Sequence, residues 1–349
     1  MTVIDRSKPV LVTGATGFVA SWLVKKLLND GLIVHAAVRN PDDEIKNRHL
    51  IDLAKSSGGT IKFFKTNLLE KDSYFEAMRE CELVFHTASP FTSNYSDAQT
   101  ELLDPAIEGT INVLLTANKS EFVKRVVLTS SCAAIYSDCT DLAKTTNNIF
   151  TENDWNTGSS LHYQPYFYSK TMAERKAWEI VEAQNKWDLV VINPSLVLGP
   201  ILNEKSSNSE SFSIFKQICD GTLRLGVPNF GLGLVDVRDL AEAHFNAGFI
   251  PQASGRNIIS GHNTNLLNIA RILHYKYGND YNIPKSSLPK WLLMLIGPLV
   301  DKQITRRFIA NNINKIWKAD NAKSIKNLKV SYRSIESTLF DTFNSIYGL

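Results

Sequence analysis

The stretch VLVTGATGFVA, residues 10–20, decides the fold of this chain. Its first four residues are apolar or β-branched, glycines follow at Gly14 and Gly17, and apolar side chains then recur at helical spacing through Leu28. A strand, a glycine turn and a helix in this order let the backbone approach a pyrophosphate, whose charge is met by the N–H groups at the helix N-terminus. Ala20, the third small residue, permits close packing of the helix on the sheet. The stretch therefore predicts a unit that binds a dinucleotide.

Outward from this unit, short β-branched runs alternate with segments of helical length. Such alternation is typical of repeated βαβ units, and hence of a parallel sheet covered by helices on both faces. We therefore predict an α/β fold with a Rossmann-type doubly wound parallel sheet. The predicted strands are residues 10–13, 33–38, 61–65, 83–86, 125–130 and 189–193.

The regular alternation ends near residue 195. Residues 203–211 are rich in Ser, Asn and Glu and predict a loop, whereas residues 232–245 predict a return to the sheet edge followed by a helix. We expect a cofactor-binding Rossmann domain over residues 1–195, with a returning segment around 229–262. Residues 196–228 and 263–349 would then form a smaller, mainly helical substrate lobe.

Composition and charge exclude several classes of protein. The 349 residues are 44% apolar and 21% charged, and a net charge of +3 gives no indication of a nucleic-acid partner. The most apolar run, residues 288–300, is too short to span ~30 Å of hydrocarbon, so we expect a buried or substrate-facing helix and no membrane span. The four cysteines form no C-x-x-C pair and no secretion signal is visible, which predicts a reducing, cytoplasmic setting.

The end of the second predicted strand indicates which dinucleotide binds. Many NAD enzymes place an acid there to bind the ribose 2′-hydroxyl, whereas this chain has Arg39. A guanidinium stacks on adenine and pairs with a 2′-phosphate, which an acid would repel. Lys46, seven residues further on, adds a second positive charge. Arg39 and Lys46 therefore predict NADP (NADPH) as the cofactor.

A tyrosine and a lysine form the candidate chemical centre. Tyr166 lies four residues before Lys170 in a stretch of helical pattern, so both side chains share one helix face. An ammonium and a nicotinamide cation both favour the phenolate, so Tyr166 can exchange a proton with a carbonyl. Upstream, Ser130 and Ser131 end a strand at the carboxyl edge of the sheet, where ligands bind. Neighbouring strand residues face opposite ways, and the spacing does not decide which hydroxyl enters the site.

Seven motifs occur in the order TGATGFVASWL, VRNP, FHTASP, VVLTSS, YFYSK, NPSLVLGP and VDVRDLAEAHF, and this set resembles the extended short-chain dehydrogenases. The branch it resembles most contains the dihydroflavonol reductases, the cinnamoyl-CoA reductases and the carbonyl (aldehyde) reductases of yeast type. The resemblance implies that Ser131, Tyr166 and Lys170 are catalytic, with Tyr166 as the proton donor and Lys170 holding the ribose. Besides Arg39, Lys46, Tyr166 and Lys170, it implies cofactor contacts at Gly14, Thr16, Gly17, Phe18, Val19, Asn67, Leu68, Thr87, Ala88, Ser89, Pro194, Ser195, Leu196 and Val197.

These features predict an NADPH-dependent reductase that converts an aldehyde or ketone to the alcohol. The alternatives are a nucleotide-sugar epimerase or dehydratase with tightly bound NAD, a steroid-type hydroxy dehydrogenase, and a dinucleotide-sensing regulator without catalysis. Arg39 disfavours the epimerase, and the intact Tyr-x-x-x-Lys motif disfavours the regulator. We expect a small-molecule carbonyl substrate, apolar or aromatic, and no metal. The residues that hint at this substrate are Phe91, Tyr136, Tyr163 and Phe212.

Overall fold

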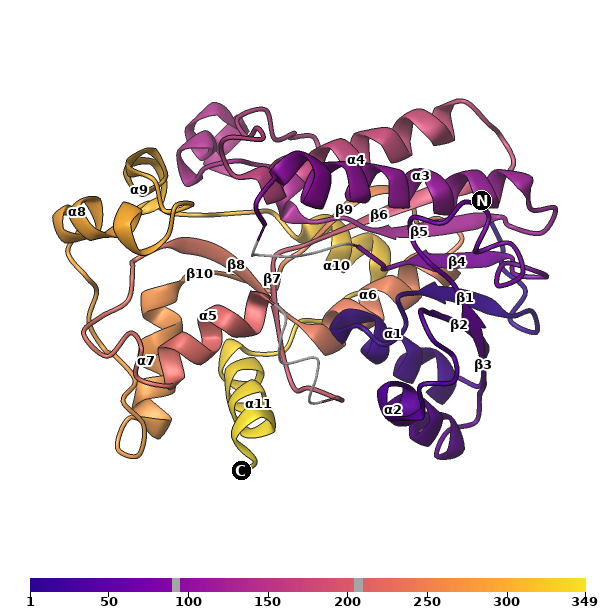
Figure 1. The fold of residues 1–349 in the computed structure, drawn as a ribbon, viewed down its shortest axis with the longest axis horizontal. Helices are drawn as coiled ribbons and strands as arrows, with labels where there is room; N and C mark the ends of the chain where they lie inside the picture. The colour runs from indigo at the N-terminus through magenta and orange to yellow at the C-terminus, as the bar shows by residue number, and fades with distance from the viewer. Residues whose placement is uncertain (90–94, 204–209) are drawn as a thin grey trace.

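The computed structural model describes residues 1–89, 95–203 and 210–349, and its largest element is a parallel sheet of seven strands (Figure 1). The strands are β1 (Val10–Thr13), β2 (Ile33–Val38), β3 (Thr60–Lys65), β4 (Leu83–His86), β5 (Arg125–Thr129), β6 (Asp188–Pro194) and β9 (Gly255–Ile259). Their spatial order is β3-β2-β1-β4-β5-β6-β9, and every neighbouring pair is parallel. The prediction of a doubly wound α/β fold is confirmed.

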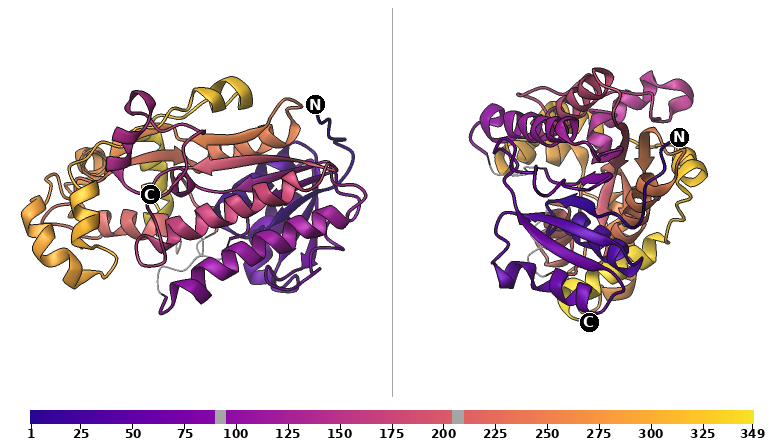
Figure 2. Two further views of the ribbon diagram at one scale, coloured as in Figure 1. Left: turned by 90° about the horizontal axis from the view of Figure 1, so that it is seen from above. Right: turned by 90° about the vertical axis from the view of Figure 1, so that its right-hand side faces the viewer.

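Helices cover both faces of this sheet, as the two groups above and below it show (Figures 1 and 2). One face carries α1 (Phe18–Asn29), α2 (Glu44–Lys55) and α6 (Val237–Phe249), and the other carries α3 (Asp104–Lys119) and α4 (Pro165–Glu182). Alternate residues of β1 serve the two cores: Val10 and Val12 pack with α1 and α6, whereas Leu11 packs with α3 and α4. Because both faces are buried, the strand is a continuous apolar run.

A second, smaller sheet lies beyond the carboxyl edge of the first. It consists of β7 (Leu196–Leu198), β8 (Gly231–Asp236) and β10 (His262–Asn265), and packs with α5 (Glu210–Cys219), α7 (Leu266–Tyr277) and α11 (Ile335–Tyr347). The predicted strand and helix over residues 232–245 exist, but the strand β8 joins this small sheet rather than the edge of the large one, which β9 forms. β8 pairs instead with β7 and β10. A Cβ at Gly233 would lie 2.4 Å from the ring of Trp317, so only glycine admits that indole across the strand.

In the described part of the chain, three helices remain: two of them lie at the outer end of the molecule, and the third follows them in the C-terminal part of the chain. They are α8 (Lys290–Val300), α9 (Arg306–Asn312) and α10 (Ala322–Leu328); the short turns are η1 (Gln99–Leu103), η2 (Cys132–Ala134), η3 (Cys139–Lys144) and η4 (Thr146–Asn148). Among the described residues, no helix is long and apolar enough to cross a membrane. The apolar run over residues 288–300 does form a helix. Trp291, Leu295 and Leu299 are largely exposed, so this helix is not buried, and its contact with the substrate stays a prediction. Most of the predicted loop over residues 203–211 lies outside the described residues.

Candidate active site

The glycine turn after β1 meets the segment after β4 at the carboxyl edge of the large sheet. Gly14 has a φ of +63°, and a Cβ at this position would lie 3.1 Å from Ala88. Such a φ and such an approach both require glycine. Gly17 is the N-cap residue of α1. Leaving out its two chain neighbours, the one described atom that an added Cβ would approach within 4 Å is the carbonyl oxygen of Gly14, at 3.2 Å. This side of the turn is therefore open, and it fits a pyrophosphate at the N-terminus of α1.

Thr13 links the two strand ends behind this turn. Its Oγ1 accepts hydrogen bonds from the backbone N–H groups of Thr87 (3.1 Å) and Ala88 (3.0 Å) and lies 3.0 Å from Nδ1 of His86. Burial lowers the pKa of His86 to about 3, and the charge of Lys170 acts in the same direction, so the imidazole is neutral. The predicted residues Thr87 and Ala88 thus lie directly beside the glycine turn.

The loop after β2 presents the two predicted cations. Arg39 is exposed immediately after the strand, and the exposed ammonium of Lys46 is paired with Asp43 at 3.1 Å. The loop is fixed by Asn47, whose buried amide donates to the carbonyl oxygens of Asn40 (3.0 Å) and Pro41 (2.9 Å). Sequence reasoning missed Asn47, because nothing but burial distinguishes it from a surface asparagine. The arrangement can receive a phosphate at Arg39, with Lys46 partly neutralised by its own acid.

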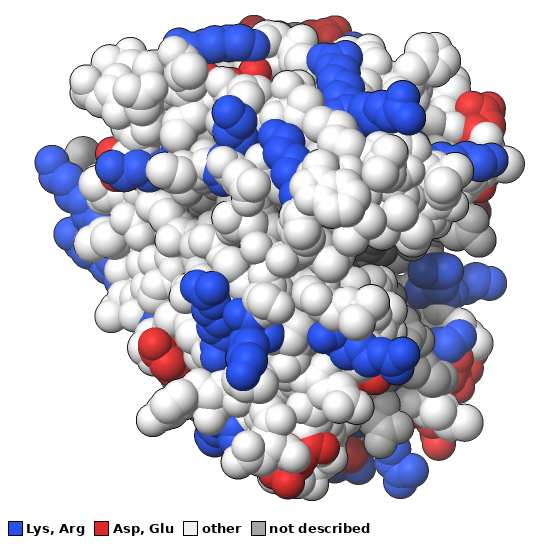
Figure 3. Space-filling view, turned by 90° about the vertical axis from the view of Figure 1, so that its left-hand side faces the viewer, with Lys and Arg blue, Asp and Glu red and all other residues white. Residues whose placement is uncertain are grey.

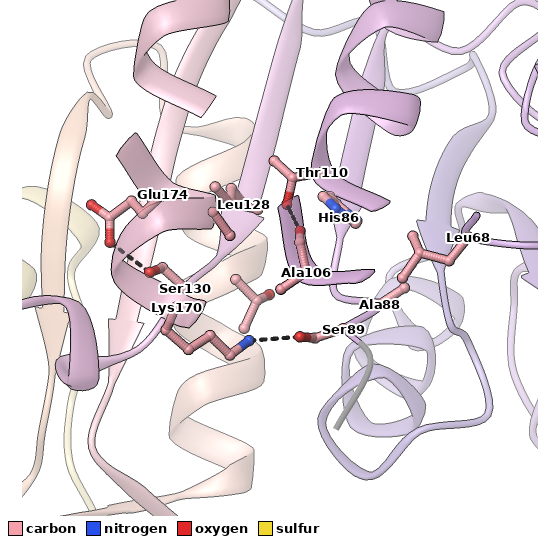
Figure 4. Close-up of a pocket in the computed structure, with 12 residues that line it drawn as sticks. Leu68, His86, Ala88, Ser89, Ala106, Thr110, Leu128, Ser130, Lys170 and Glu174 are labelled. Atoms are coloured by element: carbon pink, nitrogen blue, oxygen red, sulfur yellow. Dashed lines mark hydrogen bonds between the residues drawn. The ribbon is translucent and has the colours of Figure 1, made fainter. Parts of the chain in front are cut away.

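The predicted residues Asn67 and Leu68 lie after β3. The exposed Asn67 uses its Oδ1 to accept from the backbone N–H of Leu69 at 3.2 Å. Leu68 lines one wall of a cavity that also includes Ala88 and Ser89 (Figure 4). The structure therefore brings these two residues to the same sheet edge as the glycine turn.

The side chain of Lys170 extends from α4 toward the end of β4. Its Nζ donates to Oγ of Ser89 at 2.9 Å (Figure 4). The same atom lies 5.9 Å from the ring centre of Tyr166, one turn earlier on the helix. Desolvation lowers the pKa of this lysine to about 8. The carboxylate of Glu174 has the opposite, smaller effect and raises this pKa. Lys170 also lines a cavity of about 20 Å³, room for roughly one water molecule. Lys170 thus lies close to both Tyr166 and Ser89.

The two serines after β5 face different surroundings. Ser130 is buried, and its Oγ donates to the carboxylate of Glu174 at 2.5 Å. Ser131 is partly exposed, and its Oγ accepts from the backbone N–H of Ala133 at 3.1 Å. Because that bond uses the oxygen as an acceptor, the hydroxyl of Ser131 can still donate to a ligand. Ser130 lines the same cavity as Lys170 and Ser89, but its hydroxyl proton is used by Glu174, whereas the hydroxyl of Ser131 keeps its proton for a ligand.

A buried carboxylate, Glu174, lies behind the candidate site and was missed by sequence reasoning. It is 1% exposed and accepts hydrogen bonds from Ser130, from Nδ2 of Asn193 (2.7 Å) and from Nε of Arg256 (2.5 Å). Its position four residues after Lys170 places it on the same helix face, which is the signal that could have identified it. The network joins α4, β5, β6 and β9 at the carboxyl edge of the sheet.

The predicted residues Pro194, Ser195, Leu196 and Val197 connect β6 to the small sheet. The backbone N–H of Ser195 donates to the carbonyl oxygen of Ile259 at 3.1 Å, which fixes this crossing. The Oγ of Ser195 is buried and has no partner among the described residues. A buried hydroxyl of this kind costs free energy unless something bonds it, so it can serve a polar group of a ligand.

The aromatic residues that hinted at the substrate are engaged in packing. Tyr136 stacks on Phe150 with ring centres 4.9 Å apart, and Tyr163 donates from its hydroxyl to Asp138 at 2.6 Å. Phe212 is fully buried, and Phe91 lies outside the described residues. These residues therefore give no information about the substrate.

Comparison with known proteins places these features in a family. The model of the NAD dependent epimerase/dehydratase family matches residues 10–253. Cinnamoyl-CoA reductase CAD2 of Medicago truncatula is 41% identical over 77% of this chain and 80% of its own length. Dihydroflavonol 4-reductase of Arabidopsis thaliana is 32% identical over 81% of this chain and 73% of its own length. The crystal structure of Gre2 from Candida albicans in complex with NADPH is 29% identical, with a TM-score of 0.78 over 98% of this chain and 99% of that one.

Proposed function

The chain belongs to the NAD dependent epimerase/dehydratase family, the extended short-chain dehydrogenases, and from this we propose that it is an NADPH-dependent reductase of aldehydes or ketones. One observation carries the proposal. Lys170 lies one helical turn after Tyr166 and reaches the segment after β4, beside the glycine turn that fits a pyrophosphate. Relatives named as reductases, and a neighbour crystallised with NADPH, support the same conclusion.

In the proposed reaction, Tyr166 donates its phenolic proton to the carbonyl oxygen of the substrate. NADPH, when bound, supplies the hydride that reduces the carbonyl carbon. The ammonium of Lys170 stabilises the phenolate that remains, and solvent returns the proton to Tyr166 after each turnover. Ser131 donates a hydrogen bond to the same oxygen and holds it within reach of the phenol.

Cofactor binding follows from the glycine turn and the exposed cations. Gly14, Thr16 and Gly17 would face the pyrophosphate, together with the first residues of α1, Phe18 and Val19. Arg39, assisted by Lys46, would bind the 2′-phosphate, and Asn67 and Leu68 would contact the adenine. Around the ribose and nicotinamide we place Thr87, Ala88, Ser89, Lys170, Pro194, Ser195, Leu196 and Val197. The orphaned hydroxyl of Ser195 supports this last assignment.

The substrate would bind between the cofactor and the proposed substrate lobe, residues 196–228 and 263–349, which contains β7, most of β10 and the helices α5, α7 and α11. An apolar or aromatic carbonyl compound is supported by the names of the relatives, cinnamoyl-CoA and dihydroflavonol reductases. The four cysteines are buried thiols, which supports a cytoplasmic setting.

A screen of NADPH oxidation over aldehydes and ketones tests the proposal. We expect turnover of at least one aromatic carbonyl compound, with NADPH preferred over NADH. A purified protein that retains stoichiometric NAD and oxidises no NADPH would instead be an epimerase or dehydratase.

A further inference from the structure

Helix α8 is apolar on two opposite faces, although only one of them is covered. On the covered face, Leu293 is 7% exposed and a Cβ at Gly297 would lie 3.0 Å from Ile304 and 3.1 Å from Ile309. This face packs into the small core between α8 and α9. A helix that is hydrophobic all round is ordinarily buried all round, so the second face requires an explanation.

The uncovered face forms a continuous stripe. Trp291, Leu295 and Leu299 follow one another at intervals of four residues and are 66%, 59% and 85% exposed, whereas Ile296 and Val300, 38% and 78% exposed, lie about 100° and 140° further round the helix from Leu295. We call Trp291, Leu295 and Leu299 the α8 patch. Single exposed apolar side chains are normal on a protein surface, but a contiguous set of large ones marks a contact surface.

The chain segment that contains α8 and α9 is strongly basic. Residues 288–318 contain six Lys and Arg residues and one acid, Asp301, which gives this segment a charge of +5 in a chain whose total is +3. Figure 3, a view of this end of the molecule, shows Lys and Arg side chains around broad uncharged areas, with Asp and Glu mainly toward the margins. The basic residues of the segment are Lys290, Lys302, Arg306, Arg307, Lys315 and Lys318.

We propose that the α8 patch docks onto an anionic membrane surface, with α8 lying in the headgroup region and its basic neighbours facing the lipid phosphates. The helix has 11 residues and is therefore roughly 16 Å long, which suits a position in the interface rather than across the membrane. Tryptophan and leucine are the side chains that enter this interface, and lysine and arginine are those that anionic lipids attract.

The charge distribution disfavours a second copy of this chain as the occupant. A two-fold contact through the α8 patch would bring two segments of charge +5 against each other. An anionic membrane surface would instead attract this positively charged segment. The charges therefore favour a membrane as the binding partner of the α8 patch.

Vesicle flotation tests this proposal on the full-length protein. We expect the wild type to float with vesicles of phosphatidylcholine and phosphatidylserine, to stay behind with pure phosphatidylcholine, and to be released as salt is raised. The double variant Leu295→Ser, Leu299→Ser should lose about tenfold or more in partition, because two exposed side chains no longer insert. The charge variant Lys302→Glu, Arg306→Glu should lose about as much.

Leu115→Ser is the matched control, since Leu115 is 45% exposed on α3, away from the patch. This variant should float like the wild type, and all variants should keep wild-type NADPH binding, which shows that they are folded. Absence of wild-type flotation, or flotation that the patch variants do not weaken, would overturn the proposal. A wild-type dimer that Leu295→Ser, Leu299→Ser dissociates, without any vesicle binding, would assign the patch to a second copy instead.

Discussion

Lys170 and Arg39 are the two cations on which the proposed chemistry depends, and the structure holds them in opposite ways. Lys170 extends from α4 to Ser89, and the charge of the buried carboxylate of Glu174 raises its pKa. Arg39 stands exposed after the end of β2, on a loop whose carbonyl oxygens at Asn40 and Pro41 accept from the amide of Asn47. A charge in a desolvated site strongly shifts the proton affinity of its neighbours, whereas an exposed charge is screened by salt. The catalytic rate should therefore depend on pH, whereas the preference for NADPH over NADH should depend on ionic strength.

Removing the phenolic hydroxyl should have the largest effect. Tyr166→Phe keeps the ring but loses the proton that we assign to the carbonyl oxygen, so kcat should fall by about 10² to 10⁴. The dissociation constant of NADPH should stay within about twofold of the wild type. Steady-state kinetics and fluorescence titration measure the two quantities, and a variant with wild-type kcat would refute the role of Tyr166.

Removing the carboxylate behind the site should mainly affect stability. In Glu174→Gln the guanidinium of Arg256 loses its buried counter-charge, and we expect a loss of about 3 to 5 kcal/mol in the free energy of unfolding. Glu179→Gln is the matched control, because this carboxylate is exposed on the same helix. Urea denaturation compares the two. Equal stability of both variants would show that the Glu174 network contributes nothing to the folded state.

Reversing the charge on the exposed loop should change cofactor choice. Arg39→Asp loses a charge-assisted hydrogen bond of about 1.5 to 3 kcal/mol, so NADPH affinity should fall by roughly tenfold to a hundredfold while NADH affinity changes much less. The wild-type preference for NADPH should also shrink as salt rises. Isothermal titration of both cofactors at two ionic strengths checks this. Equal wild-type affinity for NADH and NADPH would show that Arg39 has been misassigned.

The acid-base behaviour of the desolvated lysine should appear in the pH profile. The pKa of Lys170 is lowered to about 8, so its ammonium is present below that pH and lost above it. At saturating NADPH, kcat/KM for reduction should therefore fall by up to about tenfold per unit as pH rises above about 8. Glu174→Gln should move this decline to lower pH, because the carboxylate raises the pKa of the lysine. If kcat/KM of Glu174→Gln declined at the same pH as in the wild type, the decline would not be due to the titration of Lys170.

The smallest effect is expected at the second cation of the loop. Lys46 is already paired with Asp43, so Lys46→Ala should weaken NADPH by only a few-fold, well below the effect of Arg39→Asp. Titration at one fixed ionic strength compares the two variants. A larger loss of NADPH affinity in Lys46→Ala than in Arg39→Asp would show that Lys46, despite its pair with Asp43, is the main contact of the 2′-phosphate.

Sequence patterns predicted the parts of this molecule that depend on local spacing. The glycine turn, six strands of the large sheet, and the common face of Tyr166 and Lys170 all follow from periodicity and chain order. The partners of Glu174 could not be predicted in this way, because Asn193 and Arg256 come from strands far apart in the sequence. The exposure of α8 was also missed, because an apolar pattern does not show whether other parts of the same chain cover it.

The final position of the transferred hydride tests whether this protein is an NADPH-dependent carbonyl reductase. NADPH carrying deuterium at the transferred C4 position is incubated with the protein and a carbonyl substrate found in the screen, and the product is examined by mass spectrometry. We expect one deuterium on the carbinol carbon of the alcohol for each NADPH oxidised. A product without deuterium, formed by a protein whose tightly bound NAD stays at a constant amount, would contradict the proposed reductase activity.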